Sequence, residues 1–177
     1  MQKLLFAAIV AACLNSAAAQ TVAPQAVAES ESMQVKGDFA GSLIITADAD
    51  WKKKWDGSTD AMPSFAKAGV VAYGKPVFIL TLFANPKLDG KGQANLRCDF
   101  KITNPAGKVQ LSRKDLICQA GPLAANKIGV HLSEPVIVFT GDISDAPGVW
   151  IVEVALRDAN RKLAVALRSS FELKAAK

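Results

Sequence analysis

The clearest pattern in the chain is an alternation of apolar and polar residues over several short segments. Residues 94–103 place Ala, Leu, Cys, Phe and Ile at every second position, with polar residues between them. Such alternation is typical of a strand with one buried and one solvated face. Residues 150–157 and 163–174 alternate in the same way. We therefore expect three half-buried strands whose register is well specified, because a slip of one residue would expose the apolar set.

Other apolar segments complete a β-rich pattern. Residues 77–84 are apolar on both faces, as expected for a strand that is covered on both sides. Shorter apolar segments predict further strands, and turn sequences rich in Gly, Pro, Asn and Asp separate them. These strands fall at residues 41–47, 108–111, 116–119 and 135–140. Several short strands without a long amphipathic helix predict an all-β sandwich or barrel.

One segment carries a resemblance to a known architecture. Residues 147–158 read Pro-Gly-Val-Trp-Ile-Val-Glu-Val-Ala-Leu-Arg-Asp. This run resembles the penultimate strand of many bacterial immunoglobulin-like and fibronectin-like domains, which often show Pro-x-Gly-aromatic, alternating valines and then Asp. The resemblance implies an immunoglobulin-like antiparallel β-sandwich, and it carries no particular activity.

The N-terminal residues are typical of a secretory signal peptide. Lys3 precedes an apolar run over residues 4–12, and small residues end at Ala19. This run is shorter than the roughly 20 residues that span a bilayer, and no later segment reaches that length. We expect a signal peptide at 1–19, a flexible leader at 20–36, one domain at 37–177, and a periplasmic or secreted protein. A lipobox-like Val-Ala-Ala-Cys sequence leaves open a lipid anchor through Cys13.

The cysteines indicate an oxidising compartment. The chain has three cysteines, and removal of the signal peptide leaves Cys98 and Cys118. An even pair in an exported protein predicts a disulfide. Closing a loop of about 20 residues should stabilise the fold by roughly 3 kcal/mol. Cys118 precedes the penultimate strand, so this bridge differs from the inter-sheet disulfide of antibody domains.

Catalytic and cofactor chemistry find little support in the sequence. His131 is the single histidine, and no Gly-x-Ser-x-Gly sequence is present. Histidines, cysteines and methionines are not clustered as metal sites require, and the acidic pairs at 48/50 and 142/145 are explained equally well by turns as by calcium. No glycine-rich phosphate loop precedes a helix. We therefore expect no enzyme, no metal, no cofactor and no nucleic-acid partner.

The feature that departs most from a plain sandwich is a tryptophan–lysine segment. The chain has a net charge of +5, and its charges are interspersed except at Lys52, Lys53 and Lys54, between Trp51 and Trp55. On a helix, residues i and i+4 share a face, so the two tryptophans would lie together. Aromatic rings flanked by cations suit an anionic polysaccharide, a lipid headgroup or a protein hot spot. The alternative is that both rings close one end of the sandwich.

A second candidate is the loop at residues 83–88, where apolar residues interrupt the turn that contains Asn85. This loop either contacts a partner or packs back on the edge of the domain. Taken together, the sequence favours a non-catalytic exported binding protein that acts on another cell-envelope protein, as accessory subunits, inhibitors and immunity proteins do. The alternative is a carbohydrate- or envelope-polymer-binding module that uses Trp51 and Trp55.

Overall fold

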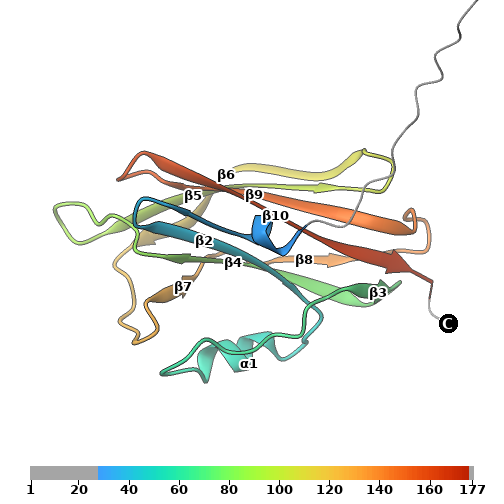
Figure 1. The fold of residues 1–177 in the computed structure, drawn as a ribbon, viewed down its shortest axis with the longest axis horizontal. Helices are drawn as coiled ribbons and strands as arrows, with labels where there is room; N and C mark the ends of the chain where they lie inside the picture. Colours follow the sequence, from blue (N-terminus) through green and yellow to red (C-terminus); the bar gives the residue numbers. More distant parts are fainter. Residues whose placement is uncertain (1–27, 176–177) are drawn as a thin grey trace, which may run out of the picture.

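The computed structural model describes residues 28–175, which form two five-stranded sheets packed face to face (Figure 1). The first sheet has the order β1-β2-β4, with β7 and β8 both paired to β4: β1 (Met33–Lys36), β2 (Phe39–Thr46), β4 (Pro76–Ala84), β7 (Val130–Leu132) and β8 (Ile137–Thr140). The second has the order β3-β10-β9-β5-β6: β3 (Val70–Ala72), β10 (Leu163–Lys174), β9 (Gly148–Asp158), β5 (Ala94–Thr103) and β6 (Val109–Gly121).

The strand order confirms the predicted all-β sandwich. The order β10-β9-β5-β6 matches the G-F-C-C′ order of a variable-type immunoglobulin sheet. The β3–β10 pair is parallel, and the other pairs of named strands are antiparallel. The segment that resembles an immunoglobulin-like strand is β9, the penultimate strand. No helix among residues 28–175 is long and apolar enough to cross a membrane.

Side chains between the two sheets form the core, and the alternating segments supply them as predicted. The apolar positions of β5 are each at most 2% exposed. At one end of the core, the ring of Phe139 packs against both Trp150 and Phe171, with centroids 4.8 and 5.3 Å away. The buried Trp150 indole N–H donates to the Ala146 carbonyl at 3.0 Å, so its polar atom has a partner.

The predicted disulfide joins neighbouring strands of one sheet. Cys98 in β5 and Cys118 in β6 are both buried, with their Cα atoms 5.8 Å apart. β6 is one continuous strand where the sequence predicted two, and its pairing with β5 shifts register at three places. Such bulges hide the alternation from a sequence reading, because each one moves the following side chains to the other face.

The N-terminal boundary differs from the prediction. The predicted signal peptide and residues 20–27 of the predicted leader lie outside the described residues. Residues 28–36, also expected in the leader, contain the 3-10 helix η1 (Glu29–Ser32) and β1, which pairs with β2. All four residues of β1 are exposed, so its pairing through the main chain leaves no side-chain pattern to detect. The ordered domain therefore begins before residue 37.

The first sheet is covered on its outer face as well. Leu80 and Leu82 of β4 are at most 1% exposed, although they lie outside the central core cluster. The helix α1 (Trp51–Asp56) lies against this side of the sheet (Figure 1), and the Trp51 ring packs on Phe78 with centroids 5.9 Å apart. β4 is therefore covered on both faces, as its sequence predicted.

Candidate functional site

The helix α1 is held in place by a half-buried ion pair. The Asp48 carboxylate accepts hydrogen bonds from Lys54 Nζ at 2.7 Å and from the Ala66 backbone nitrogen at 2.9 Å. The bond from Lys54, followed by that from Ala66, holds the pKa of Asp48 below its usual value. Lys54 also lies 3.4 Å from Asp50. Asp48, one of the candidate calcium ligands, is therefore engaged in fixing the helix.

Two of the three lysines of this helix form ion pairs with aspartates of the same protein. Lys52 pairs with Asp56 at 2.7 Å, and Lys54 pairs with Asp48. Lys53 is exposed and forms no ion pair within residues 28–175. The three lysines of the sequence motif thus divide into two paired side chains and one free charge. The cationic attraction expected of this motif is correspondingly small.

Both tryptophans of the helix lie at one hollow on the side of the sandwich. Trp51 and Trp55 are half-buried and line a space of about 590 Å³. We call this hollow the tryptophan groove; its other apolar lining residues are Ile117, Leu132, Pro135 and Val136, and its charged ones are Lys52, Asp56 and Glu134. The sequence predicted that the two indoles share a face, and the structure brings both to one groove.

The groove lies where two sheet edges meet. β6, at one end of the second sheet, supplies Ile117. In the first sheet, β7 and the connection between β7 and β8 supply Leu132 and residues 134–136, and α1 closes the third side. The Glu134 backbone N–H donates to the Cys118 carbonyl at 3.1 Å, which ties the two sheets together at this point. Because Cys118 is bonded to Cys98, the disulfide fixes one wall of the groove to the core.

A second hollow adjoins the tryptophan groove. It measures about 390 Å³, shares Trp55, Asp56 and Leu132 with the groove, and is also lined by Asn126 and His131. His131 stacks on Phe83 with ring centroids 5.3 Å apart, and its Nδ1 lies 3.2 Å from the Asn126 amide nitrogen. Burial lowers the pKa of His131. Its described contacts are those of a strand histidine packed against its neighbours.

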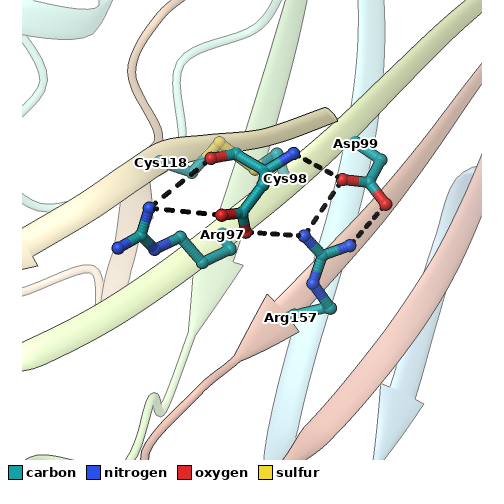
Figure 2. The surroundings of a disulfide bond; sticks show 6 residues. Arg97, Cys98, Asp99, Cys118 and Arg157 are labelled. Carbon is teal, nitrogen blue, oxygen red and sulfur yellow. Dashed lines mark hydrogen bonds and ion pairs between the residues drawn. A yellow bond between two sulfur atoms is a disulfide. The ribbon is translucent and has the colours of Figure 1, made fainter. Parts of the chain in front are cut away.

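The outer face of the second sheet carries an ion-pair network beside the disulfide. Figure 2 shows Arg157 of β9 reaching Asp99 of β5, with Nη2 3.0 Å from Asp99 Oδ1 and 3.2 Å from Asp115 Oδ1. The Asp99 carboxylate also accepts the Asp115 backbone N–H at 2.7 Å. The bonds from Arg157 and then Asp115 hold the pKa of Asp99 low. This network fastens β5, β6 and β9 together.

Asn85 is separated from the tryptophan groove. It follows β4 at the end opposite Phe78, the residue on which Trp51 packs. Its side chain is exposed, its backbone has φ 51°, and its carbonyl accepts a bond from Arg161 Nη2 at 3.1 Å. The candidate binding residues therefore fall into two groups at different places on the molecule.

The other predicted candidates have local roles. Asp142 Oδ1 accepts the Ser144 backbone N–H at 3.0 Å, and Asp145 Oδ2 accepts the Asp142 N–H at 2.9 Å. These carboxylates therefore shape their own turn. Across residues 28–175, no three His, Cys, Asp or Glu side chains are grouped as a metal site would require.

The sequence did not indicate the four apolar groove residues other than the tryptophans. Ile117, Leu132, Pro135 and Val136 come from three segments that only the sheet topology brings beside α1. The exposure of a large apolar side chain, Ile117, is also a property of the folded chain. The sequence therefore indicates the two tryptophans but not the apolar residues that line the groove with them.

Comparisons with known proteins do not identify a family. No protein-family model matches the chain, and no curated protein matches it. Among solved structures, a family 123 glycoside hydrolase from Clostridium perfringens, described in connection with glycolipid glycan hydrolysis, is similar with a TM-score of 0.43 and 11% identity. The match covers 77% of this chain and 28% of the hydrolase.

Proposed function

We propose that this protein is a non-catalytic exported binding protein whose tryptophan groove holds a segment of another cell-envelope protein. Accessory subunits, inhibitors and immunity proteins act in this way. The observation that carries the proposal is the meeting of two half-buried indoles with an exposed isoleucine at the junction of two sheet edges. The proposal concerns binding alone and assigns no reaction to the groove.

The composition of the groove supports a protein partner. Its apolar lining combines two tryptophans with Ile117, which is 56% exposed, and its three charged side chains are the polar complement expected at an interface. Protein interfaces are enriched in aromatic residues at their centres and carry a polar rim. A partner side chain that fills the hollow would cover apolar surface that water now contacts.

The strand edges beside the groove add a second mode of contact. Within residues 28–175, β6 and β8 each have one side that pairs with no other strand. An edge strand presents main-chain donors and acceptors that an extended segment of a partner can use. A partner chain lying along either edge would also reach the groove with its side chains.

The buried Cys98–Cys118 bond supports export. Structural disulfides persist in oxidising compartments and are rare in the cytosol. The proposal therefore places the protein in the periplasm or outside the cell, where its partner would also be found.

Affinity capture with two matched variants tests the proposal. Ile117 lines the groove, whereas Val70 of β3 is 62% exposed at the opposite edge of the same sheet. We expect the wild type and Val70→Lys to recover the same stoichiometric protein from the native cell envelope. Ile117→Lys should recover at least about tenfold less, because a buried charge in an interface is costly. Equal recovery by Ile117→Lys would contradict the proposal.

A second candidate function is binding of an envelope polymer, because both indoles lie at one groove and indole faces suit sugar rings. Sedimentation with purified cell-wall polymer separates the two functions. Two results together would favour the polymer. The wild type would sediment with the polymer while Trp55→Ala would not, and affinity capture would recover no protein partner. Trp55 is the better probe, because Trp51 packs on Phe78 and its loss would also disturb the fold.

A further inference from the structure

Three connections meet at one end of the sandwich, away from the tryptophan groove. They are the β1–β2 turn, the β4–β5 connection at residues 85–93 and the β9–β10 turn at residues 159–162 (left end of Figure 1). We call this region, together with Lys36 at the end of β1, the loop end. Arg161 links two of the connections by lying 3.6 Å from Asp38 and donating to the Asn85 carbonyl.

Hydrogen bonds make the loop end a fixed platform. The buried Asp158 carboxylate accepts the backbone N–H of Lys87 at 2.7 Å and that of Arg161 at 3.0 Å. The Asn160 amide donates to the carbonyls of Lys87 and Gln93, each at 2.9 Å. The backbone of these connections is therefore fixed, so binding would require little ordering of the loops themselves.

The loop end carries positive charge that the protein itself does not neutralise. Lys36, Lys87, Lys91 and Lys162 are exposed, and none forms an ion pair within the part of the chain that the structure describes. The nearby acids are already engaged: Asp158 is buried with its donors, and Asp38 pairs with Arg161. Asp89 accepts the N–H groups of Lys91 and Gln93. The free lysines thus face solvent as a group.

One of these lysines occupies a strained backbone position. Lys162 has φ 57°, in the left-handed region where glycine fits without penalty and other residues cost about 1–2 kcal/mol per residue. Backbone strain of this kind is found where the surrounding structure or a function requires it. The presence of lysine instead of glycine at this position therefore calls for an explanation.

An apolar side chain lies among the charges. Leu88 is 44% exposed between Lys87 and Lys91, in the loop that the sequence singled out for its apolar residues. A leucine flanked by lysines suits the boundary of an anionic bilayer, where the apolar group enters the headgroup region and the cations meet lipid phosphates. A purely acidic protein segment would offer no apolar surface to cover this leucine.

We infer that the loop end binds the surface of an anionic phospholipid bilayer, through Lys36, Lys87, Lys91 and Lys162 with Leu88 as the apolar contact. This site is independent of the tryptophan groove. A protein held in this way would present its groove to envelope partners while it lies on a membrane surface.

Vesicle co-sedimentation tests the inference with probes of defined charge. The mature protein should sediment with vesicles of phosphatidylglycerol and phosphatidylcholine, and not with phosphatidylcholine alone. Reversing three loop-end charges, K87E/K91E/K162E, should weaken this binding by at least about tenfold. The matched control K53E/K75E/K108E changes the net charge equally, at exposed lysines elsewhere that form no ion pair within residues 28–175, and should weaken it less than about threefold.

Two single variants sharpen the test. Lys162→Gly removes a charge and relieves the strained backbone, so it should bind anionic vesicles more weakly while its thermal midpoint stays equal or rises. Leu88→Ser should weaken binding even at low salt. Equal binding to neutral vesicles, or unimpaired binding by K87E/K91E/K162E, would overturn the inference. So would binding to polyglutamate without binding to anionic vesicles, which would indicate an acidic protein partner.

Discussion

The carboxylate of Asp158, fully buried at the end of β9, lies 2.7 Å from the backbone nitrogen of Lys87, which is 71 residues away in the sequence. The same carboxylate accepts the N–H of Arg161 at 3.0 Å. One acidic side chain thus joins the β4–β5 connection to the β9–β10 turn. It also gives a structural reason for the aspartate that ends the immunoglobulin-like segment of the sequence.

Replacement of Asp158 by alanine should lower the free energy of unfolding by about 2–3 kcal/mol, because two part-buried backbone N–H groups lose a charged acceptor. Urea unfolding measures this loss, and hydrogen exchange should quicken at the amides of Lys87 and Arg161. Asp38→Ala is the control, since the Asp38 side chain is 87% exposed and its ion pair with Arg161 is long. A loss below about 0.5 kcal/mol in Asp158→Ala would contradict this role.

Reduction of the disulfide should lower the free energy of unfolding by roughly 3 kcal/mol, because the reduced chain gains loop entropy when unfolded. Denaturant unfolding with and without reductant measures the difference. Hydrogen exchange at the Glu134 amide should also quicken, since its acceptor is the Cys118 carbonyl. Identical unfolding midpoints in the two conditions would contradict a stabilising bridge.

Close packing at Gly41 gives a third expectation. A Cβ atom at this position would lie 2.8 Å from Val165 Cγ2 and 3.2 Å from Leu156 Cδ2. Valine is stiff at χ1, so it has little room to move aside. Gly41→Ala should therefore destabilise the protein by about 1–3 kcal/mol. Gly90→Ala is the control, because no atom of residues 28–175 lies within 4 Å of a Cβ at this position, and equal stability of the two variants would refute the packing argument.

His131 should make stability depend on pH near neutrality. Burial lowers its pKa below the usual histidine value of about 6.5 in the folded protein, so the unfolded chain binds the proton first as pH falls. Stability should be constant above about pH 7 and should decline below about pH 6.5. Because the chain has one histidine, His131→Gln should remove this decline between about pH 5.5 and 7. An unchanged pH profile in the variant would show that His131 is not its source.

Part of the fold could be read from the sequence because side-chain alternation reports burial directly. β5, β9 and β10 bury the faces that their sequences predict. β1 escapes such a reading because it pairs only through its main chain and exposes all four residues. β6 escapes it for another reason, since three register shifts break its period.

The sequence predicts only those contacts of the candidate site that lie within the helix α1. The i, i+4 spacing of Trp51 and Trp55 places both rings on one side of a helix, and the Lys52–Asp56 pair has the same spacing. The pairing of Lys54 with Asp48 depends on the chain turning back before α1 begins. Ile117 reaches the groove through the pairing of strands far apart in sequence, which local spacing does not encode.

Site-specific photo-crosslinking tests the binding function most directly. A benzoylphenylalanine would be placed at Ile117 in the tryptophan groove and, for comparison, at Val70 on the opposite edge of the same sheet, both of which are exposed apolar positions. We expect position 117 to crosslink to one discrete envelope protein and position 70 to give no such product. Crosslinks of equal yield from both positions, or none from position 117, would contradict the groove as the binding site.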